Sequence, residues 1–471
     1  MKLFRRHPEV FILIGAALAT RLWGLFTPAA VVFDEVYFKV YAGDYLKHSY
    51  YFDPHPPLGK LLLAGWAWLT HLDPSSLTGT GPVVALRILP ALAGAAIIPI
   101  FYAFLRQLGA SRRIATLGAT LLLLDNALLV ESRFVLIDSM LIAFGLGAVT
   151  CFLAARRRSG RGRTAFVIAA ALLAGLAAST KWTGLTALGL IGLIWTADQI
   201  FAARKLRRDF LRDLRKRVLE GIALIFIPIL VYLSVFWVHF SLLTTSGQGD
   251  AFMSHRFQST LVGNQLYNPS VHMNFWDKFI DLNHAMSQSE ETLKTATHPY
   301  GSKWSSWPIM YRSVYYWQGE TLDDGTQGNI YLLGNPAVWW GILIIVAGGC
   351  LASSKALHRL RNFRFALIML GAGYLMNFLP FSRIVRVMFL YHYLFALIYS
   401  LAFAVLMLGA LADWNTDGPT PWKFSSPVSK NLYIGVLTVA LICFLYFAPL
   451  SYGFPLTPTE LAQHMWLPSW R

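Results

Sequence analysis

Cysteine is scarce in this chain. Of 471 residues only three are cysteines, Cys151, Cys350 and Cys443, and each lies alone in or beside an apolar run. Without a CxxC pair or a regular cysteine spacing, the sequence offers neither a disulfide framework nor a cysteine-based metal site. We therefore expect three single, buried thiols.

Charge is also sparse. Charged residues make up 14% of the chain and hydrophobic residues 56%, with a mean hydropathy of +0.50. This composition excludes an ordinary soluble domain and indicates a polytopic membrane protein. The formal net charge of +16 does not point to nucleic acid as a partner, because the basic residues fall in short clusters between apolar runs.

Long apolar runs are what the chain has in excess. Runs of roughly 17 to 25 residues are long enough to cross a bilayer as helices. The first run continues past Arg21 to about Phe26, so we predict a retained helix and not a cleaved signal peptide. The eleven predicted spans lie near residues 9–27, 82–105, 114–130, 134–155, 165–180, 183–201, 218–239, 336–353, 365–380, 387–411 and 432–450.

The distribution of lysine and arginine predicts the orientation of these spans. With a cytoplasmic N-terminus, the inner segments hold about 25 of the 40 basic residues, as the positive-inside rule requires. These segments are 1–7, 106–113, 156–163, 203–217, 354–364 and 412–431. The prediction is then a catalytic membrane module over 1–239 with a first outer loop at 28–81, a large extracytoplasmic loop over 240–335, and a C-terminal transmembrane module over 336–471.

The first outer loop carries acidic residues and a short apolar stretch. Asp34 and Glu35 follow the first span by a few residues, and Leu61–Leu69 is too short to cross a membrane. We expect that stretch to form an interfacial helix anchored by Trp66 and Trp68. Acidic residues after a helix are often merely solvated, but ionisable groups gathered near the membrane favour a functional site.

Further ionisable groups lie at the predicted outer ends of other spans. Each alone could be a helix-end residue reaching for the interface or a structural ion pair. Together they predict a polar chamber in which cations hold a phosphate and a carboxylate acts as a general base. These residues are Arg87, Asp125, Glu131, Arg133, Asp138, Lys181 with Trp182, Arg383, Arg386, Tyr391 and His392, and His55 lies in the first outer loop. A sugar linked to a lipid phosphate would present its headgroup at this depth.

Six motifs give the chain a family resemblance. They read FDEVYF, FDPHPPLGK, LLDNALL.ESRF.LIDSML, STKWTGL, HPYGSKW.SWP and R.MFLYHYLFAL, and they run from the first to the tenth predicted span. This set resembles the motifs of the protein O-mannosyltransferases, glycosyltransferase family 39, in their bacterial form. The resemblance implies an all-α polytopic membrane protein with the GT-C fold, about 11 transmembrane helices and interfacial helices in the first outer loop. It implies inverting transfer of mannose from polyprenyl-phosphate mannose to Ser or Thr hydroxyls of exported proteins.

The resemblance also implies roles for particular residues. Asp34 would be the catalytic base, with Glu35 beside it. A phosphate is already a good leaving group, so one base with cations on the phosphate suffices. For the donor phosphate and sugar we expect Arg87 and Arg386 first, then Lys181, Arg133, His55 and His392, with Asp138 positioning Arg133. For the acceptor we expect His298, Tyr300, Trp304 and Trp307, unless these rings only form an interfacial aromatic belt.

The expected partners follow from the same reading. They are the lipid-linked donor, secreted or membrane proteins emerging from the Sec translocon, and membrane lipids; neither a metal nor another cofactor is required. The protein would lie in the inner (plasma) membrane with its active site outside. The loop over 240–335 is too short for the MIR domain that eukaryotic members insert there. Two alternatives stay open: a GT-C transferase acting on a lipid such as lipid A, and a polytopic transporter.

Overall fold

Each of the eleven predicted spans contains a helix in the computed structural model, which describes residues 7–78, 81, 84–205, 213–292, 297–351, 358–415 and 421–471. Parts of the inner segments expected at 1–7, 203–217, 354–364 and 412–431 lie outside the described residues. The helices in the spans are α2 (Pro8–Leu22), α6 (Val84–Gln107), α7 (Arg112–Leu123), α8 (Asn126–Arg133), α9 (Asp138–Arg156), α10 (Gly160–Thr180), α11 (Leu185–Lys205), α13 (Leu214–Leu242), α16 (Pro336–Cys350), α18 (Arg364–Phe378), α19 (Leu394–Leu411) and α20 (Pro427–Tyr452).

Fewer of these helices reach the full length of a membrane span. Within the described part of the chain, eight are long and apolar enough to cross a membrane, or nine if α7 and α8 count as one span bent by 59°. The bend has a local cause, because Asp125 caps α8 by accepting a hydrogen bond from the Leu128 N–H at 2.9 Å. Helices α2 and α16 have 15 residues each. At 1.5 Å per residue they extend about 22 Å, less than the hydrocarbon core.

Small residues bring the helices close together. A Cβ atom on Gly94 of α6 would lie 2.2 Å from Ser132 of α8, and one on Gly145 of α9 would lie 2.4 Å from Phe395 of α19. Close approach at small residues is how helices in membranes gain packing energy where no hydrophobic effect drives them together. One apolar core runs through both halves of the bundle, from Leu13 to Trp470. The division of the chain into modules stays a prediction.

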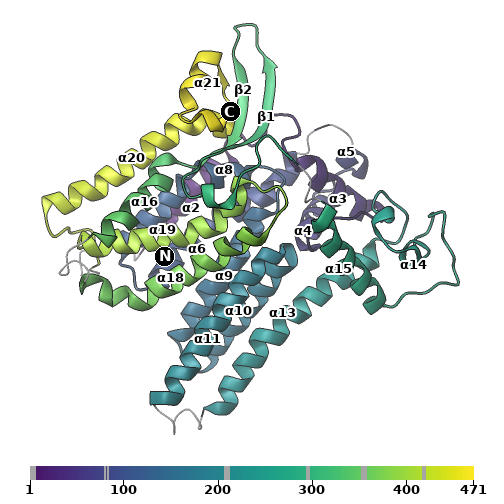
Figure 1. Ribbon diagram of the computed structural model, residues 1–471, viewed down its shortest axis with the longest axis horizontal. Coiled ribbons are helices and arrows are strands. Elements are labelled where there is room, and N and C mark those ends of the chain that lie inside the picture. The colour runs from purple at the N-terminus through teal and green to yellow at the C-terminus, as the bar shows by residue number, and fades with distance from the viewer. Residues whose placement is uncertain are drawn as a thin grey trace.

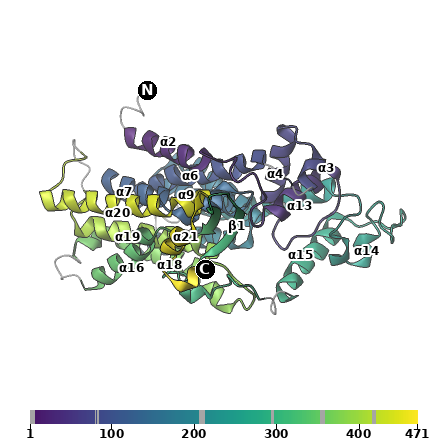
Figure 2. The same cartoon turned by 90° about the horizontal axis from the view of Figure 1, so that it is seen from above.

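The segments predicted to lie outside the membrane form a partly separate layer (Figure 1). Between α2 and α6 lie α3 (Glu35–Lys47), α4 (Leu58–Leu69) and α5 (Pro74–Thr78). Helix α4 is the short apolar helix expected in the first outer loop, and Trp66 anchors it by donating a hydrogen bond to the Ala85 carbonyl at 2.8 Å. Figure 2 shows α3 and α4 on the same side of the molecule as α14 (His255–Gln258) and α15 (Phe275–Thr292).

A small antiparallel sheet adds to the expected all-α architecture. Its strands are β1 (Val314–Thr321), β2 (Gln327–Leu332) and β3 (Pro455–Leu456), in the order β1-β2-β3. The β1–β2 hairpin projects from the helical body at the top of Figure 1. Its base lies over the first outer loop, because the Phe33 N–H donates a hydrogen bond to the Tyr316 carbonyl at 3.2 Å. The chain is therefore mainly helical, with a hairpin that reaches back to the residues before α3.

Candidate active site

Asp34 sits at the N-cap position of α3, in a turn that the β1–β2 hairpin holds. Phe33, directly before it, has a φ of +49°, a left-handed conformation that a bulky side chain adopts only under constraint. The Phe33 ring stacks on Tyr316 with centroids 4.2 Å apart. The Tyr316 hydroxyl in turn donates to a carboxylate oxygen of Glu131 at 2.6 Å. Backbone strain fixed in this way is typical of functional positions, and here it orients the residue that follows.

Glu35, the next residue, is part of a closed ion-pair network. Arg87 donates from Nε to Glu35 Oε1 at 2.7 Å and from Nη2 to Oε2 at 2.8 Å, and the Val32 and Val135 N–H groups donate to the same carboxylate. The remaining Arg87 hydrogen bonds go to the backbone carbonyls of Leu25, Pro28 and Ala30. Arg87 is 1% exposed and Glu35 3%. The expected roles of Arg87 on the donor phosphate and of Glu35 in catalysis are therefore not supported, because both side chains are saturated and buried.

Arg133 is also buried and held by backbone carbonyls, although its Nε has no hydrogen-bond partner among the described residues. Its guanidinium donates to the carbonyls of Arg21, Trp23 and Gly24 at 3.1, 2.6 and 2.9 Å, and lies 4.4 Å from the centre of the Tyr452 ring. It therefore caps the C-terminal end of α2 and ties it to α8. The expectation that Asp138 positions Arg133 is wrong, since Asp138 bonds to Lys181.

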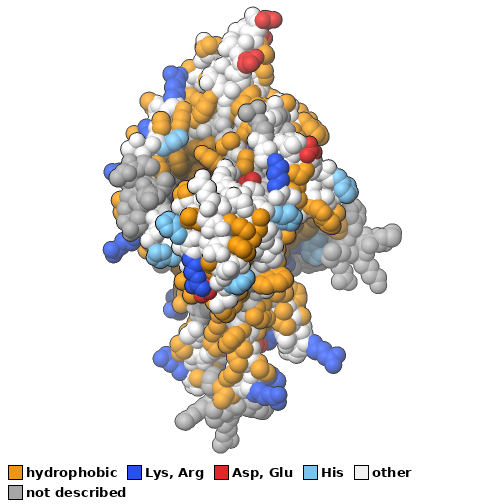
Figure 3. Space-filling view, turned by 90° about the vertical axis from the view of Figure 1, so that its right-hand side faces the viewer, with side chains coloured by type: hydrophobic (Ala, Val, Ile, Leu, Met, Phe, Trp, Pro, Cys, Tyr) orange, Lys and Arg blue, Asp and Glu red, His pale blue; other side chains and the backbone are white. Residues whose placement is uncertain are grey.

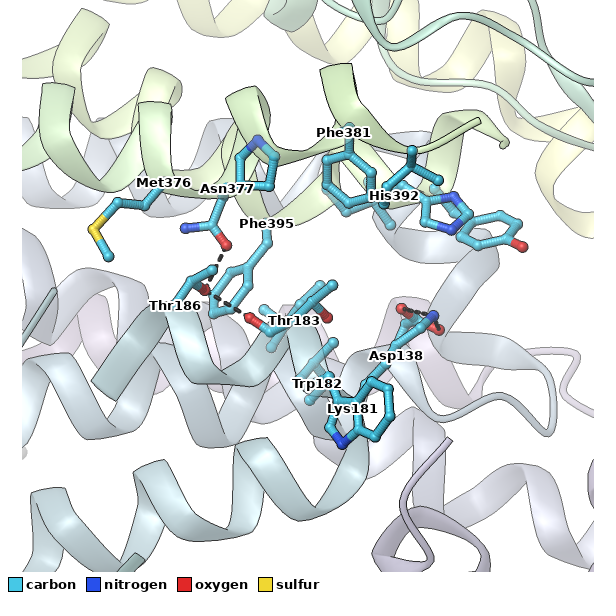
Figure 4. Close-up of a pocket in the computed structure, with 16 residues that line it drawn as sticks. Asp138, Lys181, Trp182, Thr183, Thr186, Met376, Asn377, Phe381, His392 and Phe395 are labelled. Atoms are coloured by element: carbon cyan, nitrogen blue, oxygen red, sulfur yellow. Dashed lines mark hydrogen bonds and ion pairs between the residues drawn. The ribbon is translucent and has the colours of Figure 1, made fainter. Parts of the chain in front are cut away.

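The Lys181–Asp138 pair lines one end of a cavity of about 250 Å³ (Figure 4). Lys181 Nζ donates to both carboxylate oxygens of Asp138, at 3.1 and 3.2 Å, and lies 5.5 Å from the centre of the Tyr391 ring. The two residues come from adjacent helix ends, because Asp138 begins α9 and Lys181 follows α10.

The other end of the cavity is largely apolar. Met376 and Phe395 line it, and the Thr186 hydroxyl there donates to Asn377 Oδ1 at 2.7 Å (Figure 4). A cavity with a charged end and an apolar end fits an amphiphile with an anionic headgroup. The pair Thr186–Asn377 was not predicted, although a lone Asn in the apolar run 365–380 is the kind of residue that marks a functional position in a membrane helix.

Asp34 lies beside the charged end of this cavity. Among the described residues its carboxylate has no hydrogen bond and no ion pair, but it interacts electrostatically with Lys181, Asp138 and Asp53. Burial, reinforced by the two neighbouring carboxylates and opposed by Lys181, raises the pKa of Asp34 to about 6. A carboxylate with such a pKa is ionised at neutral pH and still basic enough to accept a proton.

Three further predicted residues belong to the same electrostatic cluster. His55, Arg386 and His392 interact with one another and with Lys181. Burial together with the nearby cations holds the pKa of His55 well below its usual value, so this side chain is neutral at physiological pH. Its loop is fixed by Lys60, which forms a salt bridge with Asp53 and donates to the His55 carbonyl at 2.6 Å. The structure therefore brings together Asp34, His55, Asp138, Lys181, Arg386 and His392.

The predicted acceptor residues form two groups: His298 and Tyr300 are accessible at the surface, and Trp304 and Trp307 pack against other rings. His298 is exposed and lies against the Phe389 ring at 5.0 Å, and the half-buried Tyr300 stacks on Tyr315 at 5.7 Å. Trp304 packs against Phe378, a helical core residue, at 4.8 Å. Trp307 is fully buried, donates to the Ser302 hydroxyl at 2.9 Å and stacks on His392 at 5.9 Å. Trp307 therefore supports His392 from behind and cannot touch an acceptor directly.

Metal binding finds no support in the described part of the chain. No group of three His, Cys, Asp or Glu side chains comes together there as a possible ligand set. The Asp53 carboxylate, which lies near Asp34, is occupied by Lys60. That the protein requires no metal stays a prediction.

Comparison with known families gives two matches that together span most of the chain. Residues 11–244 match the family described as dolichyl-phosphate-mannose-protein mannosyltransferase, and residues 275–470 match the C-terminal four-transmembrane region of protein O-mannosyltransferase. Asp34, the Lys181–Asp138 pair and His55 lie in the first match, and Arg386 and His392 in the second.

Individual relatives agree with these matches. The dolichyl-phosphate-mannose–protein mannosyltransferase 4 of Saccharomyces cerevisiae is 34% identical over 287 residues, which are 57% of this chain and 37% of that protein. The chain spans about a third of the length of the curated relatives it matches.

Solved structures share the fold. The chain is similar to the S. cerevisiae protein O-mannosyltransferase Pmt1–Pmt2 complex bound to the sugar donor, with a TM-score of 0.87, 20% identity, and coverage of 99% of this chain and 93% of that one. It is less similar to ArnT from Cupriavidus metallidurans bound to undecaprenyl phosphate, with a TM-score of 0.53, 17% identity, and coverage of 95% and 77%. The predicted GT-C architecture is thereby confirmed.

Proposed function

The chain belongs to the dolichyl-phosphate-mannose-protein mannosyltransferase family, and we propose that it transfers mannose from polyprenyl-phosphate mannose to Ser or Thr hydroxyls of exported proteins. The observation that carries the proposal is the carboxylate of Asp34, which has no partner among the described residues and lies beside the Lys181–Asp138 pair, at the charged end of a cavity whose other end is apolar. The curated relatives that match the chain are named for this activity.

The proposed chemistry needs one base and one leaving group. Asp34 accepts the proton of the acceptor hydroxyl as its oxygen attacks the anomeric carbon of the sugar. The bond from that carbon to the phosphate oxygen breaks on the opposite face, so the configuration inverts and the lipid phosphate leaves with the electron pair. The polar contacts around Asp34 are consistent with this single-base scheme, because Glu35 is fixed in its ion pair with Arg87.

The donor phosphate is proposed to bind at the charged end of the cavity. Lys181 lines that end, Arg386 adds positive charge through its electrostatic interaction with the same cluster, and the neutral imidazole of His55 can donate a hydrogen bond. Asp138 orients the Lys181 ammonium group through its two hydrogen bonds. The lipid tail would leave along the apolar end, past Met376 and Phe395.

Location and partners belong to the same proposal. The chain is a multi-pass membrane protein. We place it in the plasma membrane with the N-terminus in the cytoplasm and the active site outside, where acceptor proteins emerge from the Sec translocon. His298 and Tyr300, at the outer surface, are candidates for contact with the acceptor.

Transfer from radiolabelled polyprenyl-phosphate mannose by the purified protein in nanodiscs tests this function. A Ser/Thr-rich peptide and, in a parallel reaction, lipid A are offered as acceptors, each with and without EDTA. Label in the peptide, unaffected by EDTA, is the expected result. Label in lipid A alone would favour the lipid-acceptor alternative. No label in either acceptor would reopen the transporter alternative.

A further inference from the structure

A second polar cavity lies at the opposite end of the helices that carry the active site. It has a volume of about 670 Å³ and is lined by the ends of α9, α10, α11 and α13. Its six basic residues are Arg156, Arg157, Arg158, Arg163, Lys216 and Arg217, and its three acidic residues are Asp198, Asp213 and Glu220. We call it the basic cavity.

Part of this positive charge is already neutralised. Arg156 makes two hydrogen bonds of 2.7 Å to the Asp198 carboxylate, and Arg163 makes two bonds to Glu220. Lys216 donates to Asp213 at 3.1 Å. Among the described residues that line the cavity, six cations face three carboxylates, so positive charge is in excess there.

Two neighbouring arginines have no acidic partner in the part of the chain that the structure describes. The Arg157 side chain is exposed and has neither a hydrogen bond nor an ion pair among the described residues. Arg158, also exposed, donates to the Ala154 carbonyl at 2.8 Å and lies 4.1 Å from the centre of the Phe166 ring. Their guanidinium groups can therefore take up an anion without first breaking a salt bridge.

The position of the cavity points to a membrane lipid as the source of that anion. Helix α9 has 19 residues from Asp138 at the active site to Arg156 at the basic cavity. At 1.5 Å per residue this is about 28 Å, close to the thickness of the hydrocarbon core. The basic cavity therefore lies at the level of the lipid headgroups on the opposite membrane surface.

The helices beside the basic cavity offer a path for acyl chains. Phe201 on α11 is 69% exposed, and Val218 and Leu219 on α13 are 50% and 54% exposed. Hydrophobic side chains cover the lower limb of the molecule in Figure 3, with Lys and Arg near its end. A headgroup phosphate in the cavity would leave its acyl chains on these apolar faces.

We propose that the basic cavity binds the headgroup phosphate of an anionic phospholipid, on the membrane surface opposite the active site. Basic pockets between the ends of transmembrane helices recognise such headgroups through charge and arginine hydrogen bonds. The proposal is independent of the transfer reaction, and its test does not depend on that reaction.

Native mass spectrometry of the purified protein tests the proposal. The protein is titrated with phosphatidylglycerol or phosphatidylcholine, and the bound lipids are counted. The double variant Arg157→Gln, Arg158→Gln should weaken retention of phosphatidylglycerol roughly tenfold and leave phosphatidylcholine unchanged. A matched control is Arg361→Gln, Arg364→Gln, which removes two exposed arginines near the start of α18, outside the basic cavity. The control should retain phosphatidylglycerol as the wild type does.

Several outcomes would overturn the proposal. Equal losses in both double variants would mean that diffuse surface charge holds the lipid. No loss in either variant would mean that the basic cavity does not bind the lipid. Inorganic phosphate is tested alongside as a soluble anion. If it bound as tightly as phosphatidylglycerol and through the same two arginines, the ligand would be a soluble anion and the lipid assignment would fail. Mannose transfer in phosphatidylcholine nanodiscs should be unaffected by the double variant, so failure here leaves the proposed function standing.

Discussion

Two acidic residues that are adjacent in the chain have opposite surroundings. Glu35 accepts four hydrogen bonds, two from Arg87 and two from backbone N–H groups, and is almost fully buried. Asp34 accepts none among the described residues, and its pKa is raised to about 6. The region around Glu35, Arg87 and Arg133 fixes the start of α3 against α2, α6 and α8. The region around Asp34, Lys181 and Asp138 leaves charge available at a cavity.

This difference distinguishes charged residues that stabilise the fold from charged residues that can act on a substrate. A charge whose hydrogen bonds are all satisfied inside the protein cannot respond to a substrate, but its loss leaves a buried partner unpaired. A buried carboxylate without a partner destabilises the fold and is retained where it has a task. The following variants test this contrast, beginning with the largest expected effect.

Breaking the ion pair of Glu35 should unfold the protein or nearly so. Removing one partner of a buried ion pair costs about 3–5 kcal/mol, and Arg87→Met removes backbone contacts as well. We expect little folded protein for Glu35→Gln or Arg87→Met, with a lowered Tm in what remains. The control is Arg256→Met, which removes a salt bridge with Asp277. The Arg256 side chain is 59% exposed, so its loss should cost little stability. A well-folded Glu35→Gln protein that lacked activity would instead assign Glu35 to catalysis.

Removing Lys181 should impair transfer and lower stability less than loss of Arg87, because its partner Asp138 faces the cavity and has a side chain that is 15% exposed. Loss of one positioned donor to developing charge lowers turnover by roughly 10²–10³-fold, so kcat/KM for the donor should fall by that order in Lys181→Met. The measurement is initial rate against donor concentration. Lys303→Met, an exposed lysine of the outer loop, is the control and should match the wild type. A Lys181→Met enzyme with wild-type kcat/KM would exclude Lys181 from the site.

The rate should depend on pH through Asp34. The base is active when ionised, so with a pKa of about 6 the rate rises about tenfold per pH unit below 6 and is flat above it. Lys181 lowers the pKa of Asp34, so in Lys181→Met the midpoint should move to higher pH. Initial rates from pH 4.5 to 8 would show both. A midpoint that did not move would mean that a different group titrates.

The smallest effect should come from removing the hydrogen bond between Tyr316 and Glu131, which holds the ring that stacks on Phe33. Tyr316→Phe keeps the ring stacked on Phe33 and removes the hydrogen bond to Glu131. Such a bond contributes about 0.5–1.5 kcal/mol, so transfer should fall no more than roughly tenfold. Tyr315→Phe, which removes an exposed hydrogen bond to Gln318, should have no effect. Equal losses in the two variants would contradict the idea that Tyr316 acts through the turn before Asp34.

Much of this arrangement could be predicted from the sequence, and the failures share a physical reason. Apolar runs predicted eleven spans, each of which contains a helix, since length and hydropathy are local properties. Spacing also placed Asp34, Lys181, Arg386 and His392 near one membrane surface. The sequence could not show which cation would be fully hydrogen-bonded within the protein. Arg87 and Lys181 both lie near a helix end, and only the packed structure shows that Arg87 donates to backbone carbonyls and has a structural role. The hairpin that brings Tyr316 to Phe33 joins segments almost 300 residues apart, which no local pattern reports.

The most direct test of the central claim is mannose transfer by Asp34→Asn, measured beside the wild type together with the Tm of each protein. Loss of a general base lowers the rate by roughly 10²–10⁴-fold. Because burial raises the pKa of Asp34 and so disfavours its charged form, a neutral Asn should leave the Tm unchanged or higher. A folded Asp34→Asn protein that transferred mannose within a few-fold of the wild-type rate would contradict the assignment of Asp34 as the base.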